Sequence, residues 1–465
     1  MSIPTRWAIV LVPALLLYFL PVPGLNPVQR HLLAVFVGTI ISLVAQPVVM
    51  GVSVLVAMTI LVLTNTVPGT KVLSGFSNAT VWLIFTAFLF ARAISGTGFG
   101  LRIAYLFVRR FGHSALTLGY SVAASDLALA PFIPSDTARG GGVIYPIARS
   151  LAQVFESEPG PTAGRIGAFL MLTGFHVTYT TSAMFLTGMA ANPLIAEFAR
   201  KVAHVELTWI QWAIAAAVPG LLSLALIPYL IYRLHPPEIR DTQAAQQHAM
   251  QELHRMGPLS SREWRLLAIL LGVMAGWVTS PWHGLHNAFV ALAGVSAILL
   301  CRVLTWDDLL HETKAWDALI WFAGLLMMAE ALLDSGVVKI ISSAVFARTA
   351  GWPWWAAAAF LACTYLYVHY GFASMTAHVT ALYPGFLAAG LVAGAPPLLM
   401  ALLLAFFSSL DAAMTHYGTG SAPVYFGAGY VSQTTWWKLG FLISLVNLVI
   451  WLGVGSLWWK VLGMW

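Results

Sequence analysis

Charged residues are scarce in this chain of 465 residues: Asp, Glu, Lys and Arg together make up 9% of it. A soluble globular domain carries about 25%. Hydrophobic residues make up 59%, and the mean hydropathy is +0.82. The apolar runs are continuous and about 17–25 residues long, which is the length of a membrane-spanning helix, whereas a membrane β-barrel needs short alternating segments. The composition therefore excludes a soluble domain and predicts an all-α membrane protein.

Cysteine is also scarce, and the sequence motifs of common enzymes are missing. The two cysteines, Cys301 and Cys363, lie in apolar stretches, which indicates inert small hydrophobic residues without a redox role. The sequence contains no P-loop, no H-E-x-x-H and no run of Cys and His with metal-ligand spacing. We therefore expect no cofactor and no bound metal. The net charge of +6 lies mostly in short loops, which favours orientation in a bilayer over binding of nucleic acid.

The apolar runs predict about 11 transmembrane helices plus two re-entrant helical hairpins. The first run, Trp7 to Leu20, follows Arg6 but has no small-residue cleavage site after it, so we interpret it as a retained span. The expected spans are 7–23, 28–46, 50–67, 79–97, 165–200, 208–233, 264–280, 286–304, 316–335, 397–429 and 435–462. Two of these spans contain polar residues or glycines that predict breaks, one near Thr180–Thr181–Ser182 and one near Gly418–Thr419–Gly420.

These segments divide the chain into four parts. We expect an N-terminal span at 1–27, a first repeat at 28–234 with its hairpin at 115–155, a polar cytoplasmic linker at 235–263, and a second repeat at 264–465 with its hairpin at 354–393. Basic residues are more frequent in the loops that lie inside if the N-terminus is cytoplasmic. This bias predicts a C-terminus outside, a first hairpin that enters from the cytoplasm and a second that enters from the outer side.

A short polar motif occurs twice and supports this division. Residues 134–142 read PSDTARGGG and residues 373–378 read ASMTAH, so that Ser374 follows Ser135 by 239 positions. LIFTAFLFARAISGTG at 83–98 resembles WFAGLLMMAEALLDSG at 321–336 at nearly the same offset. Any two Leu- and Ala-rich segments look alike, but a shared offset over separated segments argues against chance. An odd number of spans in each half gives opposite orientations, the inverted-repeat plan of secondary transporters.

The chemistry of the two tips favours anion binding. Each tip leaves free N–H groups where its second arm begins, and these groups carry partial positive charge. Hydroxyls at Ser135, Thr137, Ser374 and Thr376 would add donors, and such sites bind carboxylates. The alternative is that these residues only cap the second arm. Four residues of the predicted breaks complete the candidate substrate site: Thr181, Ser182, Thr419 and Gly420.

Each tip is followed by a basic residue, Arg139 in the first and His378 in the second. An arginine inside a membrane is costly and normally faces a cavity or a partner. Asp136, three positions earlier, is the expected partner if Arg139 forms a structural ion pair; otherwise Arg139 faces the substrate. His378 either titrates near neutral pH or is a hydrogen-bonded core residue. Asp126 and Asp411 are weaker candidates in neighbouring apolar segments.

Several stretches are similar to one transporter family. They are GFSN at 75–78, APF at 130–132 with TARGGG at 137–142, FLTGMAANP at 185–193 and THYGTG at 415–420. On these residues the chain resembles the divalent anion/sodium symporter family over nearly its whole length, and most closely the exchanger branch of citrate/succinate and 2-oxoglutarate/malate translocators. The resemblance implies transport of di- and tricarboxylates by a homodimer in which a scaffold part holds the contacts and a transport part moves.

The chain departs from the family pattern at both tips. The family carries Ser-Asn-Thr there, whereas this chain has Asp136 and Met375 in the middle positions. In the symporters the tips help to bind sodium and present the three side chains to substrate carboxylates. Methionine has no amide to donate, and its thioether is a poor sodium ligand. The resemblance and the residues together suggest that Arg139 and His378 supply fixed positive charge in place of sodium.

The sequence thus predicts an exchanger of small carboxylate anions in a bacterial inner membrane, working by elevator-like alternating access. The expected substrates are C4-dicarboxylates such as succinate, malate, fumarate or tartrate, with 2-oxoglutarate or citrate also open. The expected partners are these anions, membrane lipid and a second copy of the chain, without nucleic acid. Sodium- or proton-coupled uptake of the same anions is the first alternative. A channel, an intramembrane enzyme and a location in a plastid envelope are the others.

Overall fold

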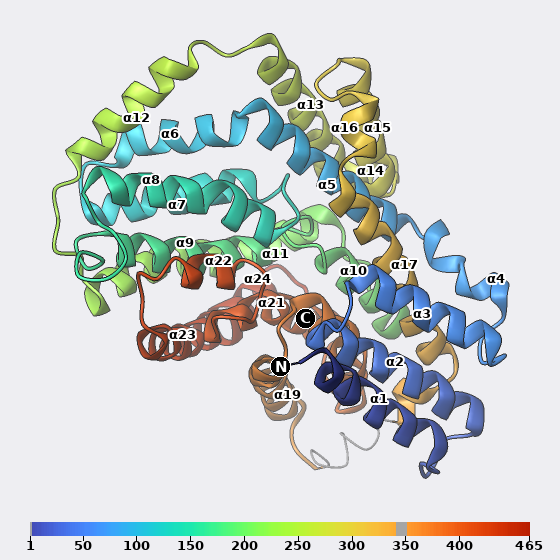
Figure 1. Ribbon diagram of the computed structural model, residues 1–465. Helices are drawn as coiled ribbons and strands as arrows, with labels where there is room; N and C mark the ends of the chain where they lie inside the picture. Colours follow the sequence, from blue (N-terminus) through green and yellow to red (C-terminus); the bar gives the residue numbers. More distant parts are fainter. Residues whose placement is uncertain (1, 341–350) are drawn as a thin grey trace.

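The computed structural model describes residues 2–340 and 351–465, and within these residues it consists of helices without a β-strand (Figure 1). The predicted all-α architecture is confirmed for this part of the chain. Residues 341–350, which belong to the expected second repeat, lie outside the described part.

One side of the molecule is built from the first helices of each half. They are α1 (Ile3–Phe19), α2 (Pro27–Ala45), α3 (Met50–Leu63), α4 (Gly69–Val72), η1 (Ser74–Ser77), α5 (Ala79–Thr97), α13 (Ser261–Val278), α14 (Ser280–His283), α15 (Asn287–Leu300), α16 (Trp306–Leu310) and α17 (Thr313–Asp334). Residues at the N-termini of these helices favour helix initiation. For example, α2 begins with a capping box between Asn26 and Gln29 and has Pro27 in its first turn. α5 and α17, which carry the similar segments of the two halves, pack against each other, α3 packs on α17, and α15 packs on α5.

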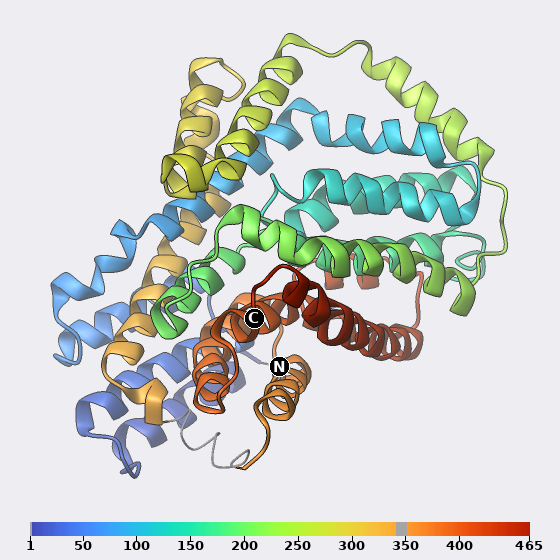
Figure 2. The same cartoon turned by 180° about the vertical axis from the view of Figure 1, so that it is seen from behind.

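The other side holds both repeated motifs. Its helices are α6 (Phe99–Phe111), α7 (Ala115–Leu129), η2 (Thr137–Ile144), α8 (Tyr145–Val154), α9 (Gly167–Met184), α10 (Asn192–Phe198), η3 (Ala199–Ala203), α11 (Trp209–Leu234), α12 (Gln243–Met256), α19 (Trp354–Val368), η4 (His369–Gly371), α20 (Met375–Val392), α21 (Pro397–Leu410), η5 (Asp411–Met414), α22 (Ala422–Gly427), α23 (Gln433–Leu448), η6 (Val449–Gly455) and α24 (Ser456–Val461). Every residue of α9 is buried, and this helix contacts α7, α8, α11 and α21. A helix that is apolar all round lies in the core. Seen from behind, α11 runs along the outside of α9 (Figure 2).

Seven of the described helical segments are long and apolar enough to cross a membrane. They are Pro27–Ala45, Ala79–Thr97, Trp209–Leu234, Thr313–Asp334, Met375–Val392, Pro397–Met414 and Gln433–Val461. Shorter apolar helices are Ile3–Phe19, Met50–Leu63, Ala115–Leu129 and Asn287–Leu300. These lengths agree with an integral membrane protein, while the number of spans and the re-entrant course of the hairpins stay predictions.

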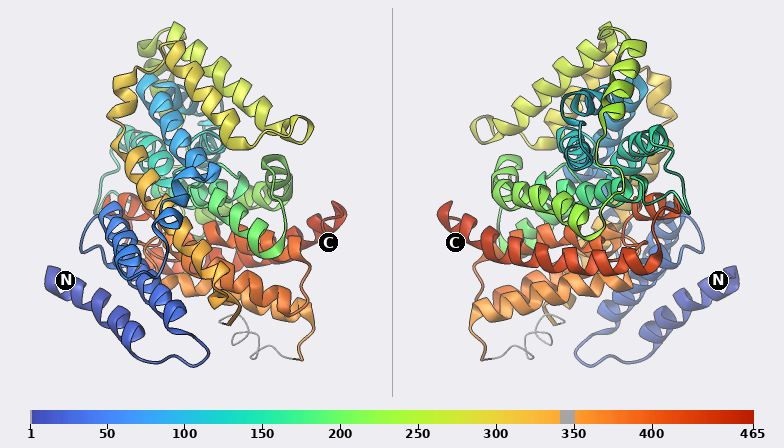
Figure 3. Two further views of the ribbon diagram at one scale, coloured as in Figure 1. Left: turned by 90° about the vertical axis from the view of Figure 1, so that its right-hand side faces the viewer. Right: turned by 90° about the vertical axis from the view of Figure 1, so that its left-hand side faces the viewer.

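The polar linker expected at 235–263 contains a helix. α12 lies along α6 at one end of the molecule, and α1 lies at the outer edge towards the other end (Figure 3). Arg102 on α6 fixes the end of the linker: its Nε donates to Glu263 over 2.6 Å, and its Nη1 donates to the carbonyl of Gly257 over 2.8 Å. The linker is therefore a packed element at this end of the fold.

The predicted position of the break agrees with the structure in one of the two interrupted helices and differs from it in the other. The second lies where expected, because regular helix ends at Met414 and resumes at Ala422. The first was placed wrongly near Thr180–Thr181–Ser182: α9 runs through these residues to Met184, and the break covers 185–191. The side chains of Thr180 and Ser182 donate to carbonyls four residues earlier, so they do not interrupt the helix.

Candidate functional site

The first tip is the turn 130–136 between α7 and η2. Pro131 and Pro134 lie in this turn, and each lacks the N–H that a continuing helix would need. The Ser135 hydroxyl accepts from the N–H of Ala138 over 3.1 Å. It therefore caps the helical segment that follows. Thr137 is exposed and Ser135 is half-buried.

The second tip repeats this geometry. α19 ends in the short turn η4, and Ser374 then caps α20 by accepting from the N–H of Ala377 over 3.3 Å. Both capping bonds span three residues, and their serines are the pair aligned by the sequence motif. Thr376 is half-buried, whereas Met375 is 4% exposed and points into the core. At the second tip the Met375 side chain is therefore buried, whereas Ser374 and Thr376 keep part of their surface exposed.

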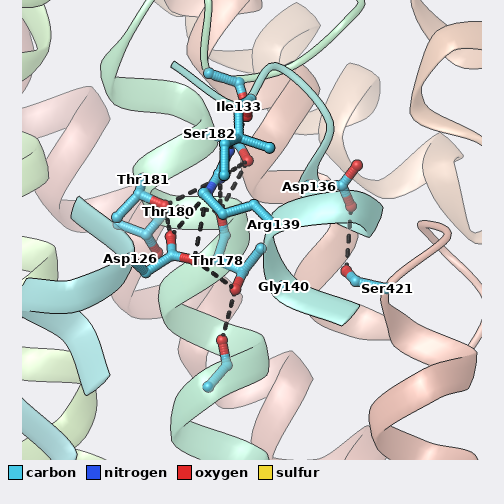
Figure 4. Close-up of polar contacts among 12 residues, drawn as sticks. Asp126, Ile133, Asp136, Arg139, Gly140, Thr178, Thr180, Thr181, Ser182 and Ser421 are labelled. Carbon is cyan, nitrogen blue, oxygen red and sulfur yellow. Dashed lines mark hydrogen bonds and ion pairs between the residues drawn. The ribbon is translucent and has the colours of Figure 1, made fainter. Parts of the chain in front are cut away.

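Arg139 lies at the centre of the first half, fully enclosed between η2, α7 and α9 (Figure 4). All five of its N–H donors are engaged. Its Nε lies 3.1 Å from the Asp126 carboxylate. The remaining donors reach the carbonyls of Ile133 (2.7 Å), Gly188 (2.9 Å) and Thr178 (3.0 Å) and the hydroxyls of Ser182 (2.7 Å) and Thr181 (3.2 Å). We refer to these six residues around Arg139 as the arginine nest.

The nest corrects two expectations. The ion-pair partner of Arg139 is Asp126, which comes from the first arm of the hairpin, and not Asp136. Arg139 also has no N–H left for a substrate, so it does not face one in this structure. Thr181 and Ser182 likewise serve the nest: both are fully buried, and the Thr181 hydroxyl also donates to Asp126.

Asp136 turns the other way, towards the second interrupted helix. Its carboxylate accepts from the hydroxyls of Thr419 and Ser421, the latter over 3.1 Å. Gly420 stands directly against Thr137, because a Cβ added to it would overlap the Thr137 hydroxyl. Glycine is therefore required for the close approach of the first tip to this break. Asp136, Thr137, Thr419 and Gly420 are thus brought together as one contact between the two halves.

The second tip reaches the same break from its other end. His369 Nε2 lies 2.8 Å from the carbonyl oxygen of Gly418. His378, which the sequence motif aligns with Arg139, is fully buried, and its Nδ1 lies 2.6 Å from a carboxylate oxygen of Asp411. The break at 415–421 therefore connects the two tips. The candidate residues that keep partial or full exposure beside it are Ser135, Thr137, Ser374, Thr376 and Gly420.

The sequence missed several residues of this arrangement. Asp126 and Asp411 were noted only as weak signals, and His369 was not placed with His378. Thr178 and Gly188 act through backbone carbonyls, for which side-chain identity gives no signal. The Gly188 carbonyl becomes available because it lies in the break of the first interrupted helix.

Comparison with known proteins agrees with these features. The family model described as the sodium:sulfate symporter transmembrane region matches residues 3–465. The chain belongs to this family of divalent anion/sodium symporters. It is 49% identical to YflS of Bacillus subtilis, whose name proposes malate transport, with 97% of this chain and 95% of that one covered. It is 43% identical to the chloroplast dicarboxylate transporter 1 of Arabidopsis thaliana, covering 97% of this chain and 82% of the other. Family membership identifies a transporter rather than an enzyme.

More distant structures share the fold. The YdaH transporter of Alcanivorax borkumensis aligns with a TM-score of 0.59 at 16% identity over 85% of this chain and 88% of that one. MtrF of Neisseria gonorrhoeae aligns with a TM-score of 0.58 at 12% identity over 98% and 97%. At these identities the similarity concerns the fold alone.

Proposed function

We propose that this protein exchanges C4-dicarboxylates across a membrane without coupling to sodium. The names of its relatives support the dicarboxylate class, since they refer to malate and dicarboxylate transport. The arginine nest supports the absence of sodium, and it is the observation on which the proposal depends.

The nest has the ligands of a cation site. Three backbone carbonyls, two hydroxyls and one carboxylate converge on the Arg139 guanidinium. In transporters with interrupted helices, carbonyls of unwound backbone and of helix ends coordinate sodium. Oxygen ligands of this kind are what hard cations prefer. A guanidinium bonded to all of these groups occupies the space between them and repels a second cation, so the protein carries its own cation between the first tip and the first break.

The role of Arg139 in this proposal differs from the one that the sequence suggested. Asp126 neutralises Arg139 inside the nest, so Arg139 does not leave positive charge facing the substrate. Its role in the proposal is to hold the tip against α9, as a bound ion would. The charge that meets the substrate then comes from the two helix N-termini behind Ser135 and Ser374, where N–H groups carry partial positive charge.

Those N-termini also give a reason for exchange. When a dicarboxylate leaves, the N–H groups and hydroxyls at the two tips lose their anionic partner. Moving unpaired donors through the low-dielectric part of a membrane is costly. The loaded form, in which carboxylates accept these hydrogen bonds, crosses more readily, and transport in one direction therefore requires return with a second anion.

The proposal includes the organisation expected from the sequence. Two inverted repeats, 28–234 and 264–465, each contribute a re-entrant hairpin and an interrupted helix, and the protein works as a homodimer by an elevator-like movement. We place it in a bacterial inner membrane with the N-terminus inside and the C-terminus outside. Two observations support the repeat. Ser135 and Ser374 each cap the helix that follows by accepting from the N–H three residues later, and α5 packs against α17.

Counterflow in proteoliposomes tests the proposed function. Purified protein is reconstituted in sodium-free buffer, and uptake of labelled succinate is compared between vesicles loaded with unlabelled succinate, loaded with propionate, or empty. Uptake only into succinate-loaded vesicles is expected, because a monocarboxylate offers one anionic group to two tips. Equal uptake into empty vesicles would exclude exchange, and stimulation by propionate would exclude selectivity for dianions.

A further inference from the structure

Three potential metal ligands meet in the second half of the molecule, behind the second tip. His369 Nδ1 lies 3.1 Å from His378 Nδ1 and 3.2 Å from Asp411 Oδ2, and His378 Nδ1 lies 2.6 Å from the same Asp411 oxygen. The three residues come from η4, α20 and η5, and all are fully buried. We refer to them as the His–His–Asp cluster.

The hydrogen-bond pattern of the cluster leaves lone pairs facing one another. His369 Nε2 lies 2.8 Å from the Gly418 carbonyl, which can only accept, so Nε2 carries the proton. In the neutral ring, His369 Nδ1 is then an acceptor. A single proton on His378 Nδ1 can bond to His369 Nδ1 and to Asp411 Oδ2. The lone pairs of His369 Nδ1 and Asp411 Oδ2 then face each other over 3.2 Å, with no proton between these two atoms.

We propose that the His–His–Asp cluster binds one divalent transition-metal ion of the zinc type. When an ion binds in front of the three atoms, the proton of the neutral His378 ring moves from Nδ1 to Nε2. The ion then accepts a lone pair from each of the three atoms and removes the opposition between acceptors. Zinc binds His nitrogen at about 2.0–2.1 Å and carboxylate oxygen at about 2.0–2.2 Å, so two of its ligands lie roughly 3.0–3.4 Å apart. Two of the three separations fall in this range, and the third, at 2.6 Å, needs to open by a few tenths of an ångström.

The surroundings of the cluster also fit a metal site. A histidine that binds a metal almost always donates its other ring N–H to a carbonyl or carboxylate, which fixes the tautomer. His369 makes this contact to Gly418. The His378 ring stacks on Tyr365 with centroids 4.3 Å apart, which fixes the orientation of the second ligand. Asp411 Oδ1 has no hydrogen-bond partner among the described residues and is free to complete the coordination.

The ligand types distinguish this cluster from the arginine nest. Two imidazole nitrogens favour zinc, copper, iron or nickel, whereas sodium, magnesium and calcium prefer oxygen. The nest offers oxygen atoms and already holds a guanidinium. The two halves would thus each carry a cation behind the tip, a built-in one in the first half and a bound one in the second.

Direct measurement of bound metal tests this inference independently of transport. The full-length protein, purified with a tag that contains no histidine, is stripped with EDTA, incubated with zinc sulfate, passed through a desalting column and analysed by mass spectrometry for zinc per chain. One zinc is expected to remain in the wild type, and it is expected to be lost in His369→Gln and in Asp411→Asn. His176→Gln is the matched control, because His176 is equally buried but bonds to Tyr179 and lies outside the cluster.

Cobalt gives a second readout, because its visible spectrum reports the coordination of the bound ion. Cobalt bound at low coordination absorbs visible light much more strongly than the aqueous ion, so the wild type and His176→Gln are expected to show this band and His378→Gln to lack it. Zinc retention by the wild type no greater than by His369→Gln, or a cobalt spectrum equal to that of the free ion, would overturn the inference. The cluster would then be a proton-sharing pair of histidines with one carboxylate.

Discussion

Replacing Arg139 with alanine should turn a sodium-independent protein into one that sodium stabilises. The substitution removes the guanidinium and leaves the buried Asp126 carboxylate without its counter-ion, with only the hydroxyls of Thr178 and Thr181 donating to it. The three carbonyls of the nest each lose a donor. Breaking a buried ion pair by removing one member costs about 3–5 kcal/mol. We therefore expect Arg139→Ala to lower the free energy of unfolding by about this amount in sodium-free buffer.

The vacated nest then offers a carboxylate, three carbonyls and two hydroxyls to a small cation. A ligand that binds only the native state at 100 times its Kd stabilises it by about 2.7 kcal/mol. Sodium should thus restore roughly half or more of the lost stability, whereas choline, which is too large to enter, should restore none.

Thermal unfolding in detergent, followed over a sodium series at constant ionic strength, measures this effect. The melting temperature of Arg139→Ala should rise with sodium, and that of the wild type should stay flat. The double variant Asp126→Ala, Arg139→Ala is the matched control, since it keeps the cavity but lacks the carboxylate, and its response to sodium should be small. A sodium response of equal size in all three proteins, or none in Arg139→Ala, would refute the interpretation of the nest as a filled cation site.

Three further changes test other contacts. Ser135→Ala and Ser374→Ala each remove a hydroxyl that the proposal places beside the substrate. Loss of a hydrogen bond worth about 1 kcal/mol should raise the KM for succinate exchange about fivefold; an unchanged KM would mean that these hydroxyls do not bind the substrate. Asp136→Ala removes hydrogen bonds to a charged group worth about 1.5–3 kcal/mol each, and should slow exchange about tenfold or more. Asp136→Asn keeps an acceptor and should retain more activity than the alanine variant. Equal rates of the two variants would exclude a role of the contact between Asp136 and the second break. Burial tends to raise the pKa of Glu263, but hydrogen bonds from Arg102 and Ser260 outweigh burial, so this pKa lies below the ordinary 4.5. The ionised carboxylate therefore stabilises the fold at pH values above 4.5. This stabilisation is lost as the pH falls through the lowered pKa of the folded protein. Glu263→Gln should accordingly expose the linker to limited proteolysis at neutral pH, with a difference from wild type that shrinks in acid; a constant difference would contradict this assignment.

The sequence located the two tips because their chemistry is local. A serine, a threonine and a basic residue recur at a fixed offset in otherwise apolar segments, and the capping bonds of Ser135 and Ser374 need only three residues to form. The second break was equally visible, since two glycines and a threonine stand together at 418–420.

The predicted position of the first break was wrong because polar side chains do not by themselves interrupt a membrane helix. Thr180 and Ser182 satisfy their hydroxyls on the helix's own carbonyls, so the helix continues. The break begins only at Phe185, in a stretch that contains Gly188 and ends before the proline of α10.

The partners of the buried charges were not predictable from spacing. Asp136 is three residues from Arg139, but the tip turns its side chain towards Thr419, while α7 folds back and brings Asp126 to the guanidinium. The cluster of His369, His378 and Asp411 likewise forms only when the second tip packs against the second interrupted helix. Such contacts depend on how hairpin arms pack, which a single sequence does not encode locally.

The most direct measurement is the initial rate of succinate exchange by the wild type with sodium replaced stepwise by choline at constant ionic strength. If Arg139 fills the place of the ion, the rate stays constant from sodium-free buffer to full sodium in vesicles loaded with succinate. A rate that falls towards zero as sodium is withdrawn would show that an ion still has to bind, and would contradict the proposed role of the arginine nest.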